Sequence, residues 1–253
     1  MSENSDYLEI CNIGKPARNG ALEPRLCIAE DGKYYYVKSE LNAGLVDLRY
    51  EYICAALAKE LELPIPAFKI VLLSQEIVDA SAFYDEGIKE RIKPESYGFA
   101  SHKIDESLPI NDKFILDLPD GLKARVLLFD LWINNNDRKE PSIEKANPNF
   151  LYVPTTSKPY LIDHNNAFAF NFEDETFFKH HVFSEAQKLW DRDFIDKECE
   201  KFERAISKIG DIVANLPQEW KFGNQELLCY NTIEQLVGFL SRFKELKLSW
   251  IRS

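Results

Sequence analysis

Polar and apolar residues alternate along the first part of the chain, a pattern typical of β-strands. Three segments show it, namely YLEICNI (7–13), PRLCIAE (24–30) and KYYYVKSE (33–40), and each is rich in β-branched or aromatic residues. The dipeptide Asp31-Gly32 between the last two segments favours the tight turn of a β-hairpin. The chain is therefore expected to begin with neighbouring strands.

A long helix and further strands are expected next. Residues 44–63 contain no proline and are rich in Leu, Ala, Glu and Lys, which predicts a helix that ends before Pro64. Residues 67–84 return to a strand-like composition, and the polar break at Ser74-Gln75 indicates a second hairpin. The irregular stretch from about 84 to 112, with scattered Gly, Pro and Ser, is interpreted as the connection between two lobes.

The second half of the chain is mainly helical. Residues 120–134 begin with an N-cap residue, Asp120, and are apolar on nearly every side, as expected for a helix buried in a core. Short strand-like runs at 150–153 and 159–163 flank a turn, and later segments carry apolar residues at helical spacing. The sequence therefore predicts an α+β protein with a strand-rich N-terminal part and a mainly helical C-terminal part.

The charge of the chain limits its partners. It has 253 residues, of which 45% are hydrophobic, and its 31 Lys+Arg against 42 Asp+Glu give a formal net charge of -11. Such a surface does not suit nucleic-acid phosphates or anionic lipids, so we expect no direct nucleic-acid binding and no membrane partner. The N-terminal residues show no basic segment followed by a long apolar run, and no stretch approaches the roughly 18 apolar residues that span a bilayer, so we expect no export signal and no membrane anchor.

The cysteines indicate a reducing compartment. Five are widely spaced and set mostly among apolar neighbours, which favours free thiols over a disulfide framework or a zinc site. His180 and His181 have no Cys or acidic residue at ligand spacing, which also disfavours zinc. The expected location is the cytoplasm.

Polar residues are concentrated at the ends of the buried elements in the second half. Asp137 follows the buried helix within NNNDRK, Asn149 precedes the run FLYV, and Asp163 ends the run PYLID. A loop carboxylate, a loop amide and a strand-end carboxylate can converge at one end of a hairpin. Phosphoryl transfer needs such groups, because it requires a carboxylate that orients the attacking hydroxyl and oxygen ligands for magnesium.

A lysine that could hold the nucleotide phosphates lies upstream. In the strand KYYYVKSE, alternation puts Tyr34, Tyr36 and Lys38 on one face. Glu51 lies within the long helix that follows, where it could pair with Lys38. The chain thus contains the lysine, the carboxylate and the oxygen ligands that a phosphoryl-transfer site requires.

Together these segments resemble the HipA-like kinases, distant relatives of protein kinases and phosphatidylinositol kinases. VLLFDLWINNNDRK, NPNFLY and LIDH are similar to the family's N-x-D-R loop, its following Asn, and its Asp after an apolar strand. Upstream, NGALEPRLCIAEDGKYYYVK and YEYICAALAKELELPIPAF are similar to the nucleotide-covering loop, lysine strand, glutamate helix and L-x-L-P-x-P exit. The similarity covers roughly residues 12 to 165 in the family's order.

The resemblance implies a two-lobed, protein-kinase-like fold, with a nucleotide-covering lobe at 1–98, a catalytic lobe at 99–253, and ATP and Mg²⁺ bound between them. It implies transfer of the γ-phosphoryl group to a hydroxyl, with a serine or threonine of a protein as the favoured acceptor. The residues carried over are the catalytic base Asp137, the phosphate-binding Lys38 with its partner Glu51, the magnesium ligands Asn149 and Asp163, the loop residues Asn19 and Gly20, and the adenine-contacting hinge residues Ala100, Ser101 and Lys103. Asn147 is a weaker alternative to Asn149.

Departures from the family pattern leave another interpretation open. The segment KEPSIEKANP lengthens the spacing from Asp137 to Asn149, so the loop must bulge outward if Asn149 is to stay in place. The covering loop has Gly14 and Gly20 but no G-x-G-x-x-G motif. These features motivate the alternative of a pseudokinase that binds nucleotide and acts as an interaction module.

Two further interpretations concern the polar cluster itself. A metal-dependent phosphohydrolase could use Asp137, Asp163 and His164, although this alternative leaves the lysine and glutamate upstream unused. The run Asn134 to Asn136 could be a structural helix end, since Asn tolerates left-handed backbone conformations.

Overall fold

The computed structural model describes residues 7–17, 22–140, 148–221, 230 and 232–251. Its backbone divides into two compact units. The first, termed the barrel unit, comprises residues 1–52, 66–105 and 216–220, and the second, termed the helical unit, comprises residues 53–65, 106–215 and 221–253. The chain therefore passes from one unit to the other several times.

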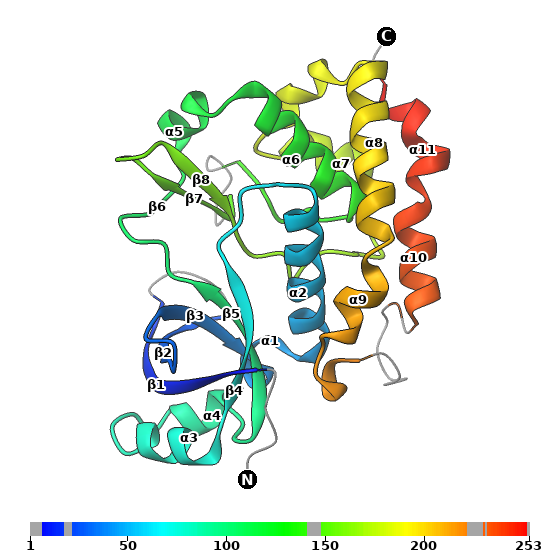
Figure 1. The fold of residues 1–253 in the computed structure, drawn as a ribbon. Coiled ribbons are helices and arrows are strands. Elements are labelled where there is room, and N and C mark those ends of the chain that lie inside the picture. The colour runs from blue at the N-terminus through cyan, green and yellow to red at the C-terminus, as the bar shows by residue number, and fades with distance from the viewer. Residues whose placement is uncertain (1–6, 18–21, 141–147, 222–229, 231, 252–253) are drawn as a thin grey trace. The chain divides into compact units, whose positions relative to one another are not determined.

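Five strands of the barrel unit close into a barrel with the order β1-β2-β3-β5-β4 (Figure 1). They are β1 (Leu8–Pro16), β2 (Arg25–Ala29), β3 (Tyr34–Ser39), β4 (Phe68–Leu73) and β5 (Ser96–His102). Neighbouring strands are antiparallel except β1 and β4, which are parallel. Gly32, with a φ of 74°, lies in the turn between β2 and β3, so the predicted hairpin is confirmed.

The alternation of side chains in β3 separates the core from the opposite face of the strand. Tyr35 and Val37 belong to the buried apolar cluster of the barrel unit, together with Cys27 of β2 and Val71 of β4. Lys38 falls between Val37 and Ser39 and therefore leaves the strand on the face opposite this cluster.

The helices of the barrel unit follow its strands along the chain. They are α1 (Glu40–Ala43), the first half of α2 (Leu45–Glu60), α3 (Gln75–Ala82), α4 (Ile88–Arg91) and a 3-10 turn (Gln218–Trp220). The predicted helix before Pro64 is confirmed as α2, whose second half belongs to the helical unit.

The second predicted hairpin is wrong in its second half, because β4 is followed by helix α3 and not by a strand. Ser74 caps this helix, since its hydroxyl oxygen accepts a hydrogen bond from the Ile77 N–H at 3.5 Å. Val78 is fully buried in the barrel core. The polar pair that indicated a turn is therefore a helix start.

The helical unit contains the remaining elements. Its helices are α5 (Asp112–Asp117), α6 (Asp120–Trp132), α7 (Asp174–His180), a 3-10 helix (Ser184–Leu189), α8 (Arg192–Ile206), α9 (Ile209–Ala214), α10 (Ile233–Ser241) and α11 (Phe243–Trp250). A small sheet of β6 (Leu108–Pro109), β7 (Phe150–Val153) and β8 (Lys158–Leu161) completes it. The predicted strand pair is confirmed as β7 and β8, which are antiparallel.

Helix α6 is largely buried, as its apolar sequence predicts. Trp132 at its end stacks on Phe202 of α8, with ring centroids 4.0 Å apart, and its indole N–H donates to the Leu240 carbonyl of α10 at 2.8 Å. The indole of Trp190 donates to the Ala124 carbonyl at 3.2 Å. Buried indoles that find acceptors fix the position of the helix as well as covering it.

The observed architecture is mixed α/β, with a strand-rich N-terminal region and a helical C-terminal region, as the sequence predicts. The expected boundary between residues 98 and 99 falls within β5, whereas the division of backbone contacts falls after Asp105. Within the described part of the chain, no helix combines the length and apolar character that crossing a membrane requires.

Candidate functional site

The barrel unit brings Lys38 and Glu51 together. Lys38 is 8% exposed in β3, Glu51 is 3% exposed in α2, and the Lys38 Nζ lies 2.8 Å from the Glu51 Oε2. Removing two charges from water is costly unless they compensate each other, so a pair this buried requires close geometry. The pairing that the sequence suggested is therefore present.

The helical unit places its candidate residues on the loop that follows α6. The helix ends in a Schellman motif, in which the Asn134 N–H donates to the Leu131 carbonyl at 3.3 Å and the Asn135 N–H to the Asp130 carbonyl at 2.8 Å. Asn134 has a left-handed φ of 51°. The structural interpretation of the asparagine run is thus confirmed for Asn134.

Arg242, from the C-terminal helices of the same unit, caps α6. Its guanidinium donates to the Trp132 carbonyl at 2.8 Å and the Leu131 carbonyl at 3.2 Å, and it also contacts the Asn134 Oδ1. A cation at a helix C-terminus is favourable because it compensates the free carbonyls. Burial lowers the pKa of Arg242 to about 10, and the side chain remains charged at neutral pH.

Asp137 is held by two amide side chains. The Asn149 Nδ2 and the Asn166 Nδ2 both lie 3.0 Å from the Asp137 Oδ2, and the Asp137 N–H donates to the Asn135 Oδ1 at 3.3 Å. Because both amides donate to the same carboxylate oxygen, they leave the Asp137 Oδ1 for another partner. A carboxylate fixed in this way could accept a proton from a hydroxyl.

The β7–β8 hairpin brings the two predicted magnesium ligands to one end. Phe150 pairs with Leu161, and the Ile162 N–H donates to the Asn149 carbonyl at 3.1 Å, so Asn149 lies beside the residue that precedes Asp163. Asn149 and Asp163 both have left-handed backbones, with φ of 50° and 62°. Carboxylate and amide oxygens are ligands that suit magnesium, and the donor set therefore fits this metal.

The lengthened spacing between Asp137 and Asn149 does not separate these residues, since their side chains are hydrogen bonded. Residues 141–147 of the insert, including the alternative ligand Asn147, lie outside the described residues. The insert therefore does not displace Asn149 from Asp137.

A buried ionic network lies behind the loop. Asp130 of α6 and Arg138 are both fully buried, with the Arg138 Nε 2.7 Å from the Asp130 Oδ2. The Asn135 Nδ2 donates to the Asp130 Oδ1 at 2.8 Å, and the Arg138 Nη1 donates to the Pro148 carbonyl at 3.3 Å and to the Asn149 carbonyl. Burial alone would raise the pKa of Asp130, but the charge of Arg138 and the hydrogen bonds around it hold that pKa well below its usual range.

His181 completes the network as a neutral ring. Its Nδ1 accepts a hydrogen bond from the Phe183 N–H at 3.0 Å, so the proton is on Nε2, which donates to the Asp130 Oδ2 at 3.0 Å. Burial lowers the pKa of His181, and the carboxylate beside it only partly offsets this effect. The histidine thus has a structural partner and is not a metal ligand in this arrangement.

The remaining predicted residues are placed as follows. Ala100 and Ser101 lie inside β5, where Ala100 pairs with Val37 on one side and Lys69 on the other. Lys103 follows the strand, and its N–H donates to the Tyr34 carbonyl at 2.8 Å. Asn19 and Gly20 lie outside the described residues. His164 is buried and packs edge-on against Phe129.

Sequence reasoning missed Asn166 and Asp130. Asn166 lies in the run DHNNAF with no pattern that distinguishes it from its neighbours. Asp130 did carry a signal, because a lone carboxylate inside VLLFDLW must be compensated once the helix is buried.

Among the described residues, no three His, Cys, Asp or Glu side chains lie close enough together to hold a metal ion. The predicted ligands Asp163 and Asn149 are one carboxylate and one amide, so they do not form a cluster of this kind.

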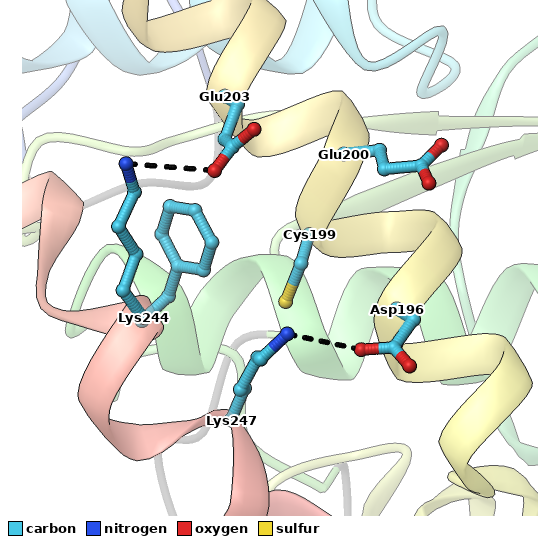
Figure 2. A pocket seen from close by; sticks show the side chains of 7 residues that line it. Asp196, Cys199, Glu200, Glu203, Lys244 and Lys247 are labelled. Carbon is cyan, nitrogen blue, oxygen red and sulfur yellow. Dashed lines mark hydrogen bonds and ion pairs between the residues drawn. The ribbon is translucent and has the colours of Figure 1, made fainter.

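A hollow of about 470 Å³ lies elsewhere on the helical unit, between α8 and α11 (Figure 2). Lys247 pairs with Asp196 at 3.1 Å and Lys244 with Glu203 at 3.4 Å across it. Burial raises the pKa of the Cys199 thiol in its wall to about 11, so the thiol is unreactive at neutral pH. The lining contains none of the predicted site residues.

Comparison with known proteins identifies the class. The fold is similar to that of the proinflammatory kinase CtkA of Helicobacter pylori, with a TM-score of 0.55 and 12% identity over 94% of each chain. This likeness shows that the two chains share a fold. The model of the HipA-like kinases matches residues 10–248, and the chain belongs to the HipA-like kinase family. No curated protein sequence matches it.

Proposed function

We propose that this protein is an ATP- and magnesium-dependent kinase that transfers the γ-phosphoryl group to a serine or threonine of a protein. The observation that carries the proposal is the arrangement of Asp137 in the loop after the buried helix α6, where two amides hold it by one carboxylate oxygen. Membership of the HipA-like kinase family supports the reaction class. The protein acceptor follows the family alone.

Asp137 would act as the base. Its Oδ1 would receive the proton of the acceptor hydroxyl as the oxygen attacks the γ-phosphorus, while Asn149 and Asn166 keep the carboxylate from rotating. Catalysis would therefore depend on positioning more than on covalent chemistry.

Asn149 and Asp163 would hold Mg²⁺. When bound, the metal neutralises charge on the phosphate oxygens. The fit rests on the oxygen donors of the two residues and on the hairpin that brings them to the same end. The hydrogen bond from the Ile162 N–H to the Asn149 carbonyl, which ties the backbone of Asn149 to the residue before Asp163, supports this assignment.

The barrel unit would supply the nucleotide contacts, and the two units would act as the two lobes of a kinase. Lys38, oriented by Glu51, would hold the ATP phosphates. Asn19 and Gly20 of the covering loop, and Ala100, Ser101 and Lys103 near the end of β5, are the proposed further contacts with the nucleotide.

The first test measures thermal unfolding with ATP alone and with magnesium-ATP. At 100 times its dissociation constant, a ligand adds about 2.7 kcal/mol of stability, enough to move the midpoint by several degrees. The magnesium-dependent part should disappear in Asp163→Asn. If neither condition moves the wild-type midpoint at millimolar ATP, the kinase proposal is wrong.

The second test measures turnover. Radiolabelled ATP and a mixture of cellular proteins should give acid-stable phosphoserine or phosphothreonine, and Asp137→Asn should reduce the rate by about 10² to 10⁴-fold. Asp117→Asn, which changes an exposed carboxylate at the end of α5, is the matched control and should retain the wild-type rate. Magnesium-ATP binding without turnover would favour the pseudokinase alternative.

A further inference from the structure

The buried carboxylate of Asp130 contacts two segments of the helical unit, one of which is the loop that carries Asp137. It receives hydrogen bonds from Asn135 and Arg138 of the loop after α6 and from His181 beyond α7. It is fully buried, so it cannot contact nucleotide or acceptor directly. Any effect on the reaction must pass through the residues that it holds.

We infer that Asp130 is a positioning residue that sets Asp137 and Asn149 relative to each other. The inference rests on the proposed function and extends it, because it names the part of the fold on which the geometry of the base and of a magnesium ligand depends. It involves two separate connections, one to each of these residues.

The first connection runs through Asn135. Its amide nitrogen donates to the Asp130 Oδ1 at 2.8 Å, and its amide oxygen accepts the Asp137 N–H at 3.3 Å. Asn135 is fully buried, so the amide is confined between the carboxylate of Asp130 and the backbone of the base. Rotation of this amide would move the backbone that carries Asp137.

The second connection runs through Arg138. The guanidinium donates to both oxygens of Asp130, at 2.7 Å from Nε and 3.5 Å from Nη2. Its Nη1 donates to the carbonyls of Pro148 and Asn149, just before β7. A planar guanidinium bound on two sides transmits orientation better than a flexible ammonium, so Arg138 links Asp130 rigidly to the ligand strand.

His181 anchors the network on its third side. Its neutral ring donates to the Asp130 Oδ2 and accepts the Phe183 N–H, and the segment around it pairs with the loop, since the Val182 N–H donates to the Arg138 carbonyl at 3.1 Å. The carboxylate is thus surrounded by donors. A fully satisfied buried network of this kind favours one conformation, which is what a positioning role requires.

The test compares three variants of the full-length chain. Asp130→Asn keeps the size of the side chain and removes its charge, Asn135→Ala removes the connection to Asp137, and Ile195→Ala truncates a fully buried side chain of α8 as a control for lost stability. The measured quantities are kcat and KM for magnesium-ATP by ADP release with water as acceptor, the unfolding midpoint, and hydrogen exchange of the Asp137 amide.

We expect Asn135→Ala to lower kcat at least about tenfold while KM for magnesium-ATP stays within about threefold, because small misplacements of a reacting group have large effects on rate. Asp130→Asn should lower kcat further. Ile195→Ala should keep kcat within about twofold despite an equal or larger fall of the midpoint. Asn135→Ala keeps the test valid if Asp130→Asn does not fold.

A wild-type kcat in Asn135→Ala, or a parallel loss of kcat in Ile195→Ala, would show that the network serves stability alone. If the proposed function itself is wrong, the result differs: the wild-type protein will show no ATP turnover that Asp137→Asn abolishes. In that case hydrogen exchange decides the inference. Exchange of the Asp137 amide should rise at least about fivefold in Asn135→Ala, relative to Ile195→Ala, because a hydrogen bond worth about 1 kcal/mol is lost. Equal exchange in the two variants would overturn it.

Discussion

Replacing Lys38 by methionine should destabilise the barrel unit strongly. At an effective dielectric constant of about 20, unit charges 2.8 Å apart attract by about 6 kcal/mol, part of which offsets their removal from water. Breaking a buried pair from one side costs about 3–5 kcal/mol, since the other charge stays buried. For a chain of this size the unfolding midpoint should therefore fall by roughly 6 to 20 °C.

A second substitution separates this effect from nucleotide binding. In Lys38→Met/Glu51→Leu both charges are gone, and replacing a buried ion pair by apolar groups is often neutral, so most of the lost stability should return. Stabilisation by magnesium-ATP should not return, because the lysine proposed to hold the phosphates is absent from both variants.

Calorimetry with and without magnesium-ATP measures both quantities. Lys33→Met is the matched control, because this lysine lies in the same hairpin and its exposed ammonium lies 3.7 Å from the Asp31 carboxylate. It should cost less than about 1 kcal/mol. A loss of stability in Lys38→Met no larger than in Lys33→Met, or a further loss when Glu51→Leu is added, would contradict this expectation.

Three further predictions concern other parts of the chain. Burial lowers the pKa of His181 below 6.5, so its neutral ring contributes stability that is complete above that pH and declines as the pH falls. The unfolding midpoint should therefore change between about pH 7.5 and 5.5, and His181→Gln should reduce this change. His180→Gln is the control and should leave it as in wild type. Burial raises the pKa of Cys27 to about 12, and iodoacetamide at about pH 8 should label exposed Cys11 but leave Cys27 unmodified, as peptide mass spectrometry can show. Arg242→Met removes charged donors from the end of α6 and should lower the free energy of unfolding by about 2–3 kcal/mol in calorimetry, with partial recovery in Arg242→Lys.

Elements with a strong local signal could be predicted from the sequence. The first strands follow from alternation and from Asp31-Gly32, and helix α2 from a proline-free run that ends before Pro64. The error at Ser74 has a local cause too, because Ser before a polar pair suits both a turn and a helix N-cap, and only burial of Val78 decides between them.

The candidate residues could be named from the sequence, but the residues that hold them in place could not. The order of these residues is visible in the sequence, because Asp137, Asn149 and Asp163 flank apolar elements, while Lys38 and Glu51 lie within a predicted strand and the helix that follows it. The contacts of Asp130 with His181 and of Asn166 with Asp137 join positions 51 and 29 residues apart. No local pattern specifies such pairs, since they depend on how the loops pack.

The left-handed backbones of Asn134, Asn149 and Asp163 have a consequence for dissecting this site. Asn and Asp are the residues with side chains that tolerate this conformation best, and they are also good oxygen donors. At these positions alanine would change two properties at once, because it lacks the donor and also strains the bend, by about 1–2 kcal/mol. Glycine adopts positive φ without this strain, so Asn149→Gly and Asp163→Gly would remove the oxygen proposed to bind Mg²⁺ while leaving the local backbone geometry intact.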